Sequence, residues 1–356
     1  MSLMFNNQNR YLWSSASSYG DDAVEDNVLD TDADRIWQDV RNIDITPTGE
    51  VVHVPRQRGS AAGNKHGFIK GMCEVSGEVP LQPYISASDQ ISYNDAILKM
   101  MNFEPDLSVS DEATYTLKTK AQADATIYKY LRNVEGDKQR LLTAIGTRAN
   151  GNFTFETNAE PIIGIDSGLA RYNALTDPAE FIDTDGAAAL LKDGSTTVTA
   201  LSTGEEKFAD VDPLMCSGMT LTVGGTEHTV SATNLDLAWT VDTIEAITGD
   251  STLRKVILTR DDSDSRPNGS FSLVDFTDAI LNDIITKYQN GEELALVLTA
   301  DNGTDQITMT MGQVQLGVPE AGSNGNLRQY DIPFHLNGDW SDLAGDNDIS
   351  LLFDAV

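Results

Sequence analysis

Cysteine, positive charge and long apolar runs are all scarce in this 356-residue sequence. Its two cysteines, Cys73 and Cys216, form no metal-binding pair and exclude a disulfide-stapled fold. No apolar run approaches the ~18 residues of a membrane span, and we expect no secretory signal at the N-terminus. The 24 basic residues face 55 acidic ones, a net charge of −31. This balance argues against tight binding to nucleic acid and against adhesion to anionic membranes.

Motifs for catalysis and for cofactor binding are missing as well. There is no GxSxG elbow, no phosphate-binding GxxxxGK[ST] loop and no GxGxxG sequence after a strand. The histidines are far apart, and none of them belongs to an HExxH motif or lies at zinc-ligand spacing: His53, His66, His228 and His335. We therefore expect a protein that is not an enzyme and that holds no metal and no cofactor.

Alternation of apolar and polar residues dominates the chain from Gly67 onward. Ala113, Tyr115 and Leu117 lie on one side of such a run, and the later half alternates more clearly still. With 40% apolar and 7% aromatic residues, the composition is that of a folded globular chain. The pattern predicts a mainly β protein.

Two segments have the periodicity of a helix, and they resemble each other. Residues 93–98 and 276–281 share the sequence Asp-Ala-Ile-Leu, and the second continues to a stop at Asn290-Gly291. The apolar residues predicted to pack each helix against a sheet are Ile97, Leu98, Ile280, Ile284 and Tyr288. The order of elements after each helix also matches, which favours a duplicated unit; chance resemblance of one tetrapeptide is the alternative.

These patterns divide the chain into four parts. Residues 1–65 are predicted to form a polar, acidic arm or extended loop, and residues 184–212 an acidic, turn-rich linker. Residues 66–183 and 213–356 are predicted to form two tandem β-sandwich or barrel units, each with one flanking α-helix.

Basic residues are concentrated in the first of these units. Seven of the 24 fall within 31 residues: Lys118, Lys120, Lys129, Arg132, Lys138, Arg140 and Arg148. In so acidic a chain, a positive patch would suit docking against an identical copy; a solvated strand face with long aliphatic stems is the alternative.

Several short motifs resemble the tail tube proteins, or major tail proteins, of long-tailed bacteriophages. Residues 259–262, 266–271 and 330–339 are similar to the C-terminal part of that family. Residues 144–155 resemble the strand that follows the family's Gly-x-Arg turn, and residues 347–353 resemble its acidic turn and last strand. The resemblance covers residues 67 to 356.

This resemblance implies a structural virion protein whose copies form stacked rings with one continuous inner β-barrel. The stack would be a negatively lined conduit for genome DNA, assembled in the bacterial host cytoplasm without a membrane. Its partners would be itself, the tape-measure protein and the tail-tip and terminator proteins. If both halves are tube domains, three chains make a ring, and we favour three over six. The alternatives are a tail completion or adaptor ring and a non-phage β-sandwich that binds ligands or forms surface layers. The sequence does not identify the residues that face the lumen.

Overall fold

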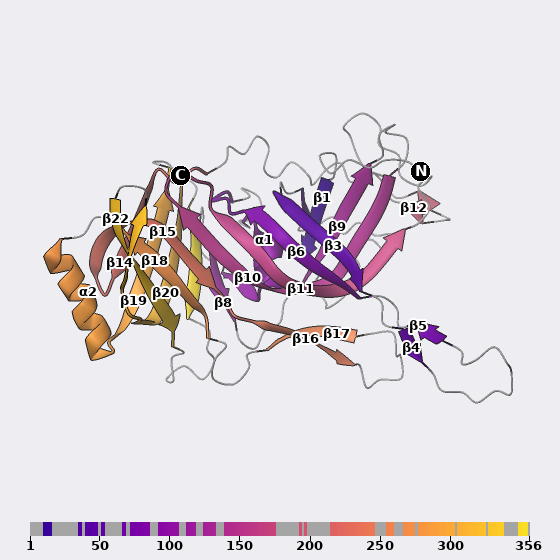
Figure 1. The fold of residues 1–356 in the computed structure, drawn as a ribbon. Coiled ribbons are helices and arrows are strands. Elements are labelled where there is room, and N and C mark those ends of the chain that lie inside the picture. The colour runs from indigo at the N-terminus through magenta and orange to yellow at the C-terminus, as the bar shows by residue number, and fades with distance from the viewer. Residues whose placement is uncertain are drawn as a thin grey trace.

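A computed structural model gives the fold of the chain (Figure 1). It describes residues 10–15, 35–37, 40–48, 51–53, 66–68, 72–85, 92–106, 112–118, 124–132, 139–175, 192–193, 196–197, 214–245, 254–259, 266–274, 277–302, 305–324, 327–337 and 348–354.

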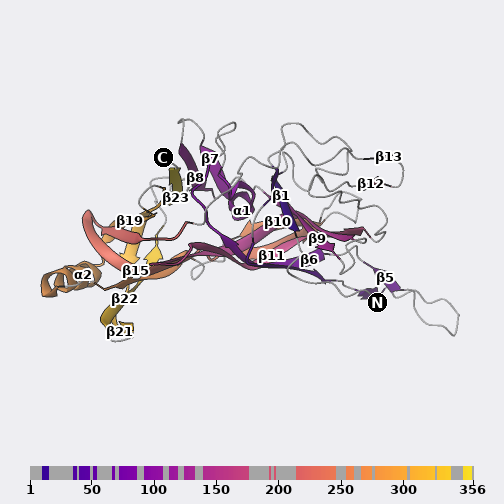
Figure 2. The same cartoon turned by 90° about the horizontal axis from the view of Figure 1, so that it is seen from above.

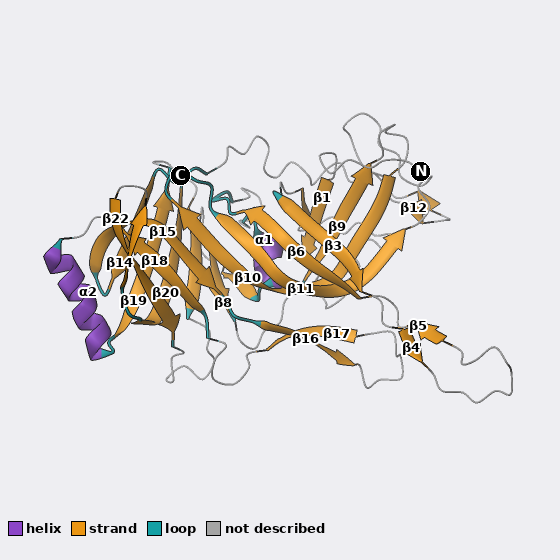
Figure 3. Ribbon diagram, in the orientation of Figure 1, coloured by secondary structure: helices purple, strands orange, loops and turns teal. Residues whose placement is uncertain are grey.

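The protein is mainly β, as the sequence predicts (Figure 3). The strands before residue 200 are β1 (Arg10–Ser15), β2 (Arg35–Trp37), β3 (Asn42–Thr48), β4 (Val51–His53), β5 (His66–Phe68), β6 (Met72–Pro80), β7 (Phe103–Asp106), β8 (Glu112–Leu117), β9 (Ala125–Arg132), β10 (Gln139–Glu156), β11 (Ile162–Leu175), β12 (Lys192–Asp193) and β13 (Thr196–Thr197). The later strands are β14 (Gly218–Val223), β15 (Thr226–Asp236), β16 (Thr240–Glu245), β17 (Arg254–Thr259), β18 (Asn268–Leu273), β19 (Glu293–Asp301), β20 (Gln306–Leu316), β21 (Glu320–Asn324), β22 (Leu327–Leu336) and β23 (Ile349–Asp354).

Six strands of the later half close into a barrel. Their order around the barrel is β14, β15, β18, β22, β20 and β19, and β19 pairs again with β14. Alternation places one face of each strand inside, as in β19, where Leu296, Leu298 and Ala300 are fully buried. Closure leaves these strands with few free edges and gives the apolar residues a common interior.

The earlier half forms an antiparallel sheet in the order β2, β1, β9, β10, β11, β6 and β3. Although β9 and β3 are four places apart, the ammonium of Lys129 on β9 donates a 2.6 Å hydrogen bond to the carbonyl of Ile43 on β3. The sheet therefore curls strongly, so that these two strands approach each other.

The two halves are joined by shared hydrogen-bonded strands. Residues 152–156 of β10 pair with residues 232–236 of β15, and β8 pairs with β23. Figure 2 shows α1, β7, β8 and β23 together on one side of the long sheet that contains β6, β10 and β11. One hydrophobic cluster runs through both halves.

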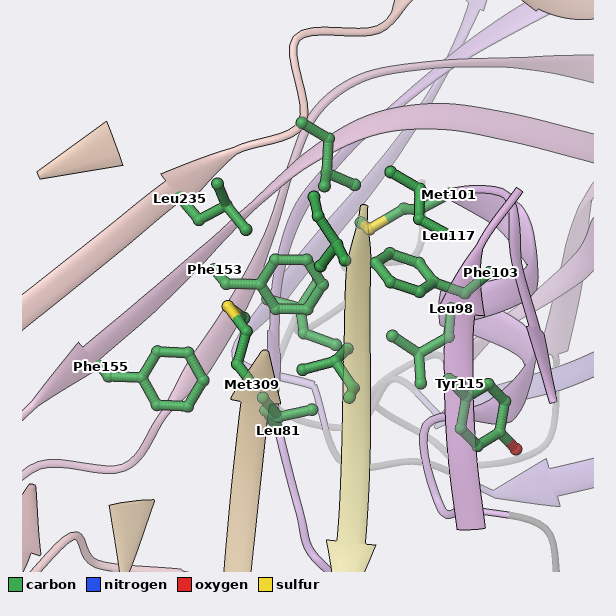
Figure 4. Close-up of a cluster of buried hydrophobic side chains, with 14 of the residues drawn as sticks. Leu81, Leu98, Met101, Phe103, Tyr115, Leu117, Phe153, Phe155, Leu235 and Met309 are labelled. Atoms are coloured by element: carbon green, nitrogen blue, oxygen red, sulfur yellow. The ribbon is translucent and has the colours of Figure 1, made fainter. Parts of the chain in front are cut away.

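The core between these layers includes aromatic pairs among many aliphatic side chains, and Figure 4 shows Phe103 and Phe153 within it. The rings of Phe103 and Phe153 meet edge to face with centroids 5.9 Å apart, and Tyr115 and Phe353 do so at 5.7 Å. Such pairs add about 1 kcal/mol each beyond the burial of their area. Because Phe353 comes from the later half and Tyr115 from the earlier one, the second pair ties the two halves together.

The N-terminal segment differs from the arm that the sequence predicts for residues 1–65. Strand β3 lies within it, pairs with β6 along its whole length, and buries Ile43 and Ile45. The predicted linker, residues 184–212, lies outside the described residues except for β12 and β13.

Both predicted helices are present, with very different surroundings. The short helix α1 (Asp95–Met100) is almost entirely buried. The longer helix α2 (Asp278–Asn290) is capped by Thr277, whose hydroxyl accepts a 3.3 Å hydrogen bond from the amide of Ile280. It ends at Gly291, which has φ of 62°, the left-handed conformation that glycine adopts at little cost. In the described part of the chain, neither helix has the length and apolar character needed to cross a membrane.

Candidate functional site

A row of register partners, polar except for one glycine, crosses seven hydrogen-bonded strands on the outer face of the joined sheet. Each member is the register partner of the next, from β3 through β6, β11, β10, β15 and β18 to β22. The row consists of Asn42, Glu78, Gly164, Asn152, Asp236, Asn268 and His335. On the opposite face of β10, Phe153 and Phe155 point into the core. The row therefore continues across the junction between the halves, where Asn152 on β10 is the register partner of Asp236 on β15.

Carboxylates are numerous on this polar face. By strand alternation and by register, eight acidic residues lie on it: Asp44, Glu74, Glu78, Glu156, Asp166, Asp236, Glu320 and Asp331. The positive side chains near this face include Arg41, which pairs with Glu160 at 3.2 Å, Lys129, which pairs with Asp44 at 3.6 Å, and Arg266, which donates to Asn337. The face consequently carries a surplus of negative charge.

Amide side chains organise the centre of the face. The Asn152 amide donates to both carboxylate oxygens of Asp166, at 2.7 and 2.8 Å, and the Asn150 amide donates to Asp236 at 3.0 Å. Burial raises the pKa of Asp166, the hydrogen bond from Asn152 lowers it, and the nearby charge of Asp236 raises it further. Neutral amides thus hold these carboxylates in place without cancelling their charge.

The sheet that carries the polar face has several strand edges. Among the described strands, those that pair on one side only are β2, with β1; β3, with β6; β7, with β8; and β21, with β22. Backbone groups along such an edge can pair with a strand of another chain. Strand β3 begins the polar row and β21 lies beside its last strand, β22, so these two edges could let one copy meet the next head to tail.

The hairpin formed by β16 and β17 covers part of the outer face near the middle of β10. The guanidinium of Arg148 on β10 donates a 2.6 Å hydrogen bond to the carbonyl of Val256 on β17. At the start of the hairpin, the amide of Trp239 donates to the side-chain oxygen of Asn150 at 2.8 Å. Val256 and Leu258, which belong to β17 of this hairpin, are buried.

The basic patch predicted from the sequence is not a continuous exposed surface. Arg148 is fully buried and Lys129 is 8% exposed, because each turns inward to a backbone carbonyl of another strand. Lys118 is partly buried. Lys120 and Lys138 lie outside the described residues, as do the side chains of Arg132 on β9 and Arg140 on β10.

The residues predicted to pack the helices lie at the core. Ile97, Leu98 and Ile284 are fully buried, while Ile280 and Tyr288 are partly buried and pack against the main hydrophobic cluster.

The described residues bring together no group of three or more histidine, cysteine or acidic side chains that could hold a metal ion. Burial raises the pKa of Cys73 to about 12. Burial, and secondarily the charge of Asp301, raises the pKa of Cys216 to about 11. At neutral pH both are therefore protonated thiols, which are poor nucleophiles.

Sequence reasoning did not find the polar row, because its members come from strands spread between residues 42 and 335. The available signal was local: Asn152, Thr154 and Glu156 alternate with two buried phenylalanines. In comparisons with known proteins, no protein-family model and no curated protein matches the chain.

Proposed function

We propose that this chain is a structural virion protein, a bacteriophage tail tube subunit, whose polar face lines a conduit for DNA. The observation that carries the proposal is the polar row across seven strands with its surplus of carboxylates. Fixed negative charge repels phosphates, so DNA can slide along such a wall without binding to it. The net charge of −31 fits the same role.

Ring formation would use the two ends of the same sheet. A contact between the β3 edge of one copy and the β21 edge of the next is heterologous. Such contacts form a closed ring when the rotation from one copy to the next divides a full turn into a whole number of steps. Each chain supplies two sheet-and-helix halves, so we propose three chains in a ring. Stacked rings would form the tube in the virion after assembly in the host cytoplasm, with tape-measure, tail-tip and terminator proteins as partners.

Electron microscopy of the concentrated full chain, with native mass spectrometry, tests the assembly. We expect annuli or hollow filaments, and ring masses at multiples of three chains. Single rings that never stack would favour an adaptor role instead. A chain that stays monomeric even with a tail-tip complex added would contradict the proposal.

Charge reversal tests which face lines the channel. The variant Glu74→Lys, Glu78→Lys, Glu156→Lys reverses three exposed charges on the polar face. Its tubes should retain double-stranded DNA that wild-type tubes exclude. The matched control Glu104→Lys, Asp106→Lys, Glu292→Lys changes the net charge equally, using exposed residues outside this face. Equal DNA retention by both variants would contradict the assignment of the face.

A further inference from the structure

His228 lies on β15 near one end of the closed barrel, with its side chain turned inward. It is 4% exposed, its register partner on β14 is the fully buried Leu221, and Val230 follows on the same face. Among the histidines whose side chains the structure describes, the other is His335, which is exposed on β22.

Within the described part of the chain, neither ring nitrogen of His228 has a hydrogen-bond partner. Burying a neutral imidazole without hydrogen-bond partners costs a moderate amount of free energy. An imidazolium would carry two unsatisfied N–H donors and a full charge into the apolar interior, which costs far more.

Helix α2, which follows β18 and precedes β19 in the sequence, packs over this end of the barrel. Ile284 enters the core, and the ammonium of Lys287 donates a 3.2 Å hydrogen bond to the carbonyl of Val223 at the end of β14. Asp283 pairs with Lys287 at 2.7 Å. The helix thus presents a cation and its carboxylate partner close to the buried imidazole.

These neighbours oppose a positive charge on the ring. Burial lowers the pKa of His228, the charge of Lys287 lowers it further, and Asp283 acts in the opposite direction. The Lys287–Asp283 pair is already satisfied, so a charged His228 would add a second cation beside it.

We propose that His228 makes α2 a pH-sensitive cap, which is seated on the barrel while the imidazole is neutral and released when the ring gains a proton. The proposal does not depend on the chain forming a tube. Because the pKa of His228 is lower in the seated state, the stabilisation is complete above the ordinary histidine pKa of 6.5 and is lost as the pH falls below it.

Amide hydrogen exchange of the full chain, read by mass spectrometry on peptides that cover α2, tests this device. After correction for the intrinsic exchange rate, wild-type α2 should exchange about tenfold faster one pH unit below 6.5 than at neutral pH. His228→Leu should abolish this dependence, and His335→Leu should leave it as in the wild type. Protection that does not change with pH, or that changes equally in His228→Leu, would overturn the proposal.

Ring-proton NMR of the wild type gives a second test that needs no folded variant. The His228 signal should titrate below 6.5, in step with a loss of α2 protection. Titration at the ordinary value with α2 still protected would overturn the proposal.

Discussion

The guanidinium of Arg148 and the carbonyl oxygen of Val256 lie 2.6 Å apart, although 108 residues separate them in sequence. Arg148 is among the largest fully buried side chains of the protein. A charge placed this deep is tolerated where its donors find hydrogen-bond acceptors, as the guanidinium does at the Val256 carbonyl. The contact fixes the hairpin of β16 and β17 on the outer face of β10.

Loss of this contact should weaken the protein measurably. Arg148→Met keeps much of the aliphatic volume but removes the hydrogen bond from the guanidinium to the Val256 carbonyl, and we expect a loss of about 2 kcal/mol in the free energy of unfolding. Urea denaturation measures it. Arg148→Lys should recover little of the loss, since an ammonium cannot reproduce the planar array of donors. An unchanged urea midpoint for Arg148→Met would contradict this role.

A second prediction concerns the close approach of β15, β18 and β22 at Gly269. A Cβ placed there would overlap the carbonyl oxygen of Asn234 and would lie 2.7 Å from Cζ of Phe334. We expect Gly269→Ala to cost about 2 kcal/mol or more, because backbone and a buried ring would both have to move. In the control Gly218→Ala, the atom nearest to the added Cβ would lie 3.8 Å away. The thermal midpoint of this variant should therefore stay close to that of the wild type. Equal effects of the two substitutions would count against this packing.

Local sequence patterns predicted the local elements well. Alternation indicated strands such as β19, and the Asn290-Gly291 pair marked the end of α2 at the residue where the structure has it. These features depend on neighbouring residues, and a sequence displays them directly.

Features that depend on distant partners were not predicted. Arg148 and Lys129 were assigned to an exposed patch because cations usually lie at the surface, and the carbonyls that hold them belong to distant strands. In β3, Ile43 and Ile45 gave an alternating signal, but it was too short to stand out within a polar segment. The polar row, likewise, depends on the register of seven strands.

Helix α2 provides a third prediction, in which two adjacent isoleucines should respond differently. Ile284 is fully buried in the hydrophobic cluster, whereas Ile285 is partly exposed. We expect Ile284→Ala to lower the free energy of unfolding by about 3 kcal/mol, and Ile285→Ala by less than half as much. Both lose the same atoms and have similar helix propensity changes, so the difference in urea denaturation isolates burial. Similar losses would show that α2 is not seated as described.

The two thiols allow a fourth prediction, of chemical behaviour in the native state. Because Cys73 and Cys216 are buried and burial raises the pKa of each, few thiolates exist at neutral pH. Labelling with a thiol-reactive disulfide reagent should therefore be slow in buffer and should reach both thiols rapidly in denaturant. At any pH from 7 to 9, native labelling should be far slower than labelling of an unfolded cysteine, whose pKa is about 8.5. Rapid stoichiometric labelling of either thiol in the folded protein would contradict the burial on which this prediction rests.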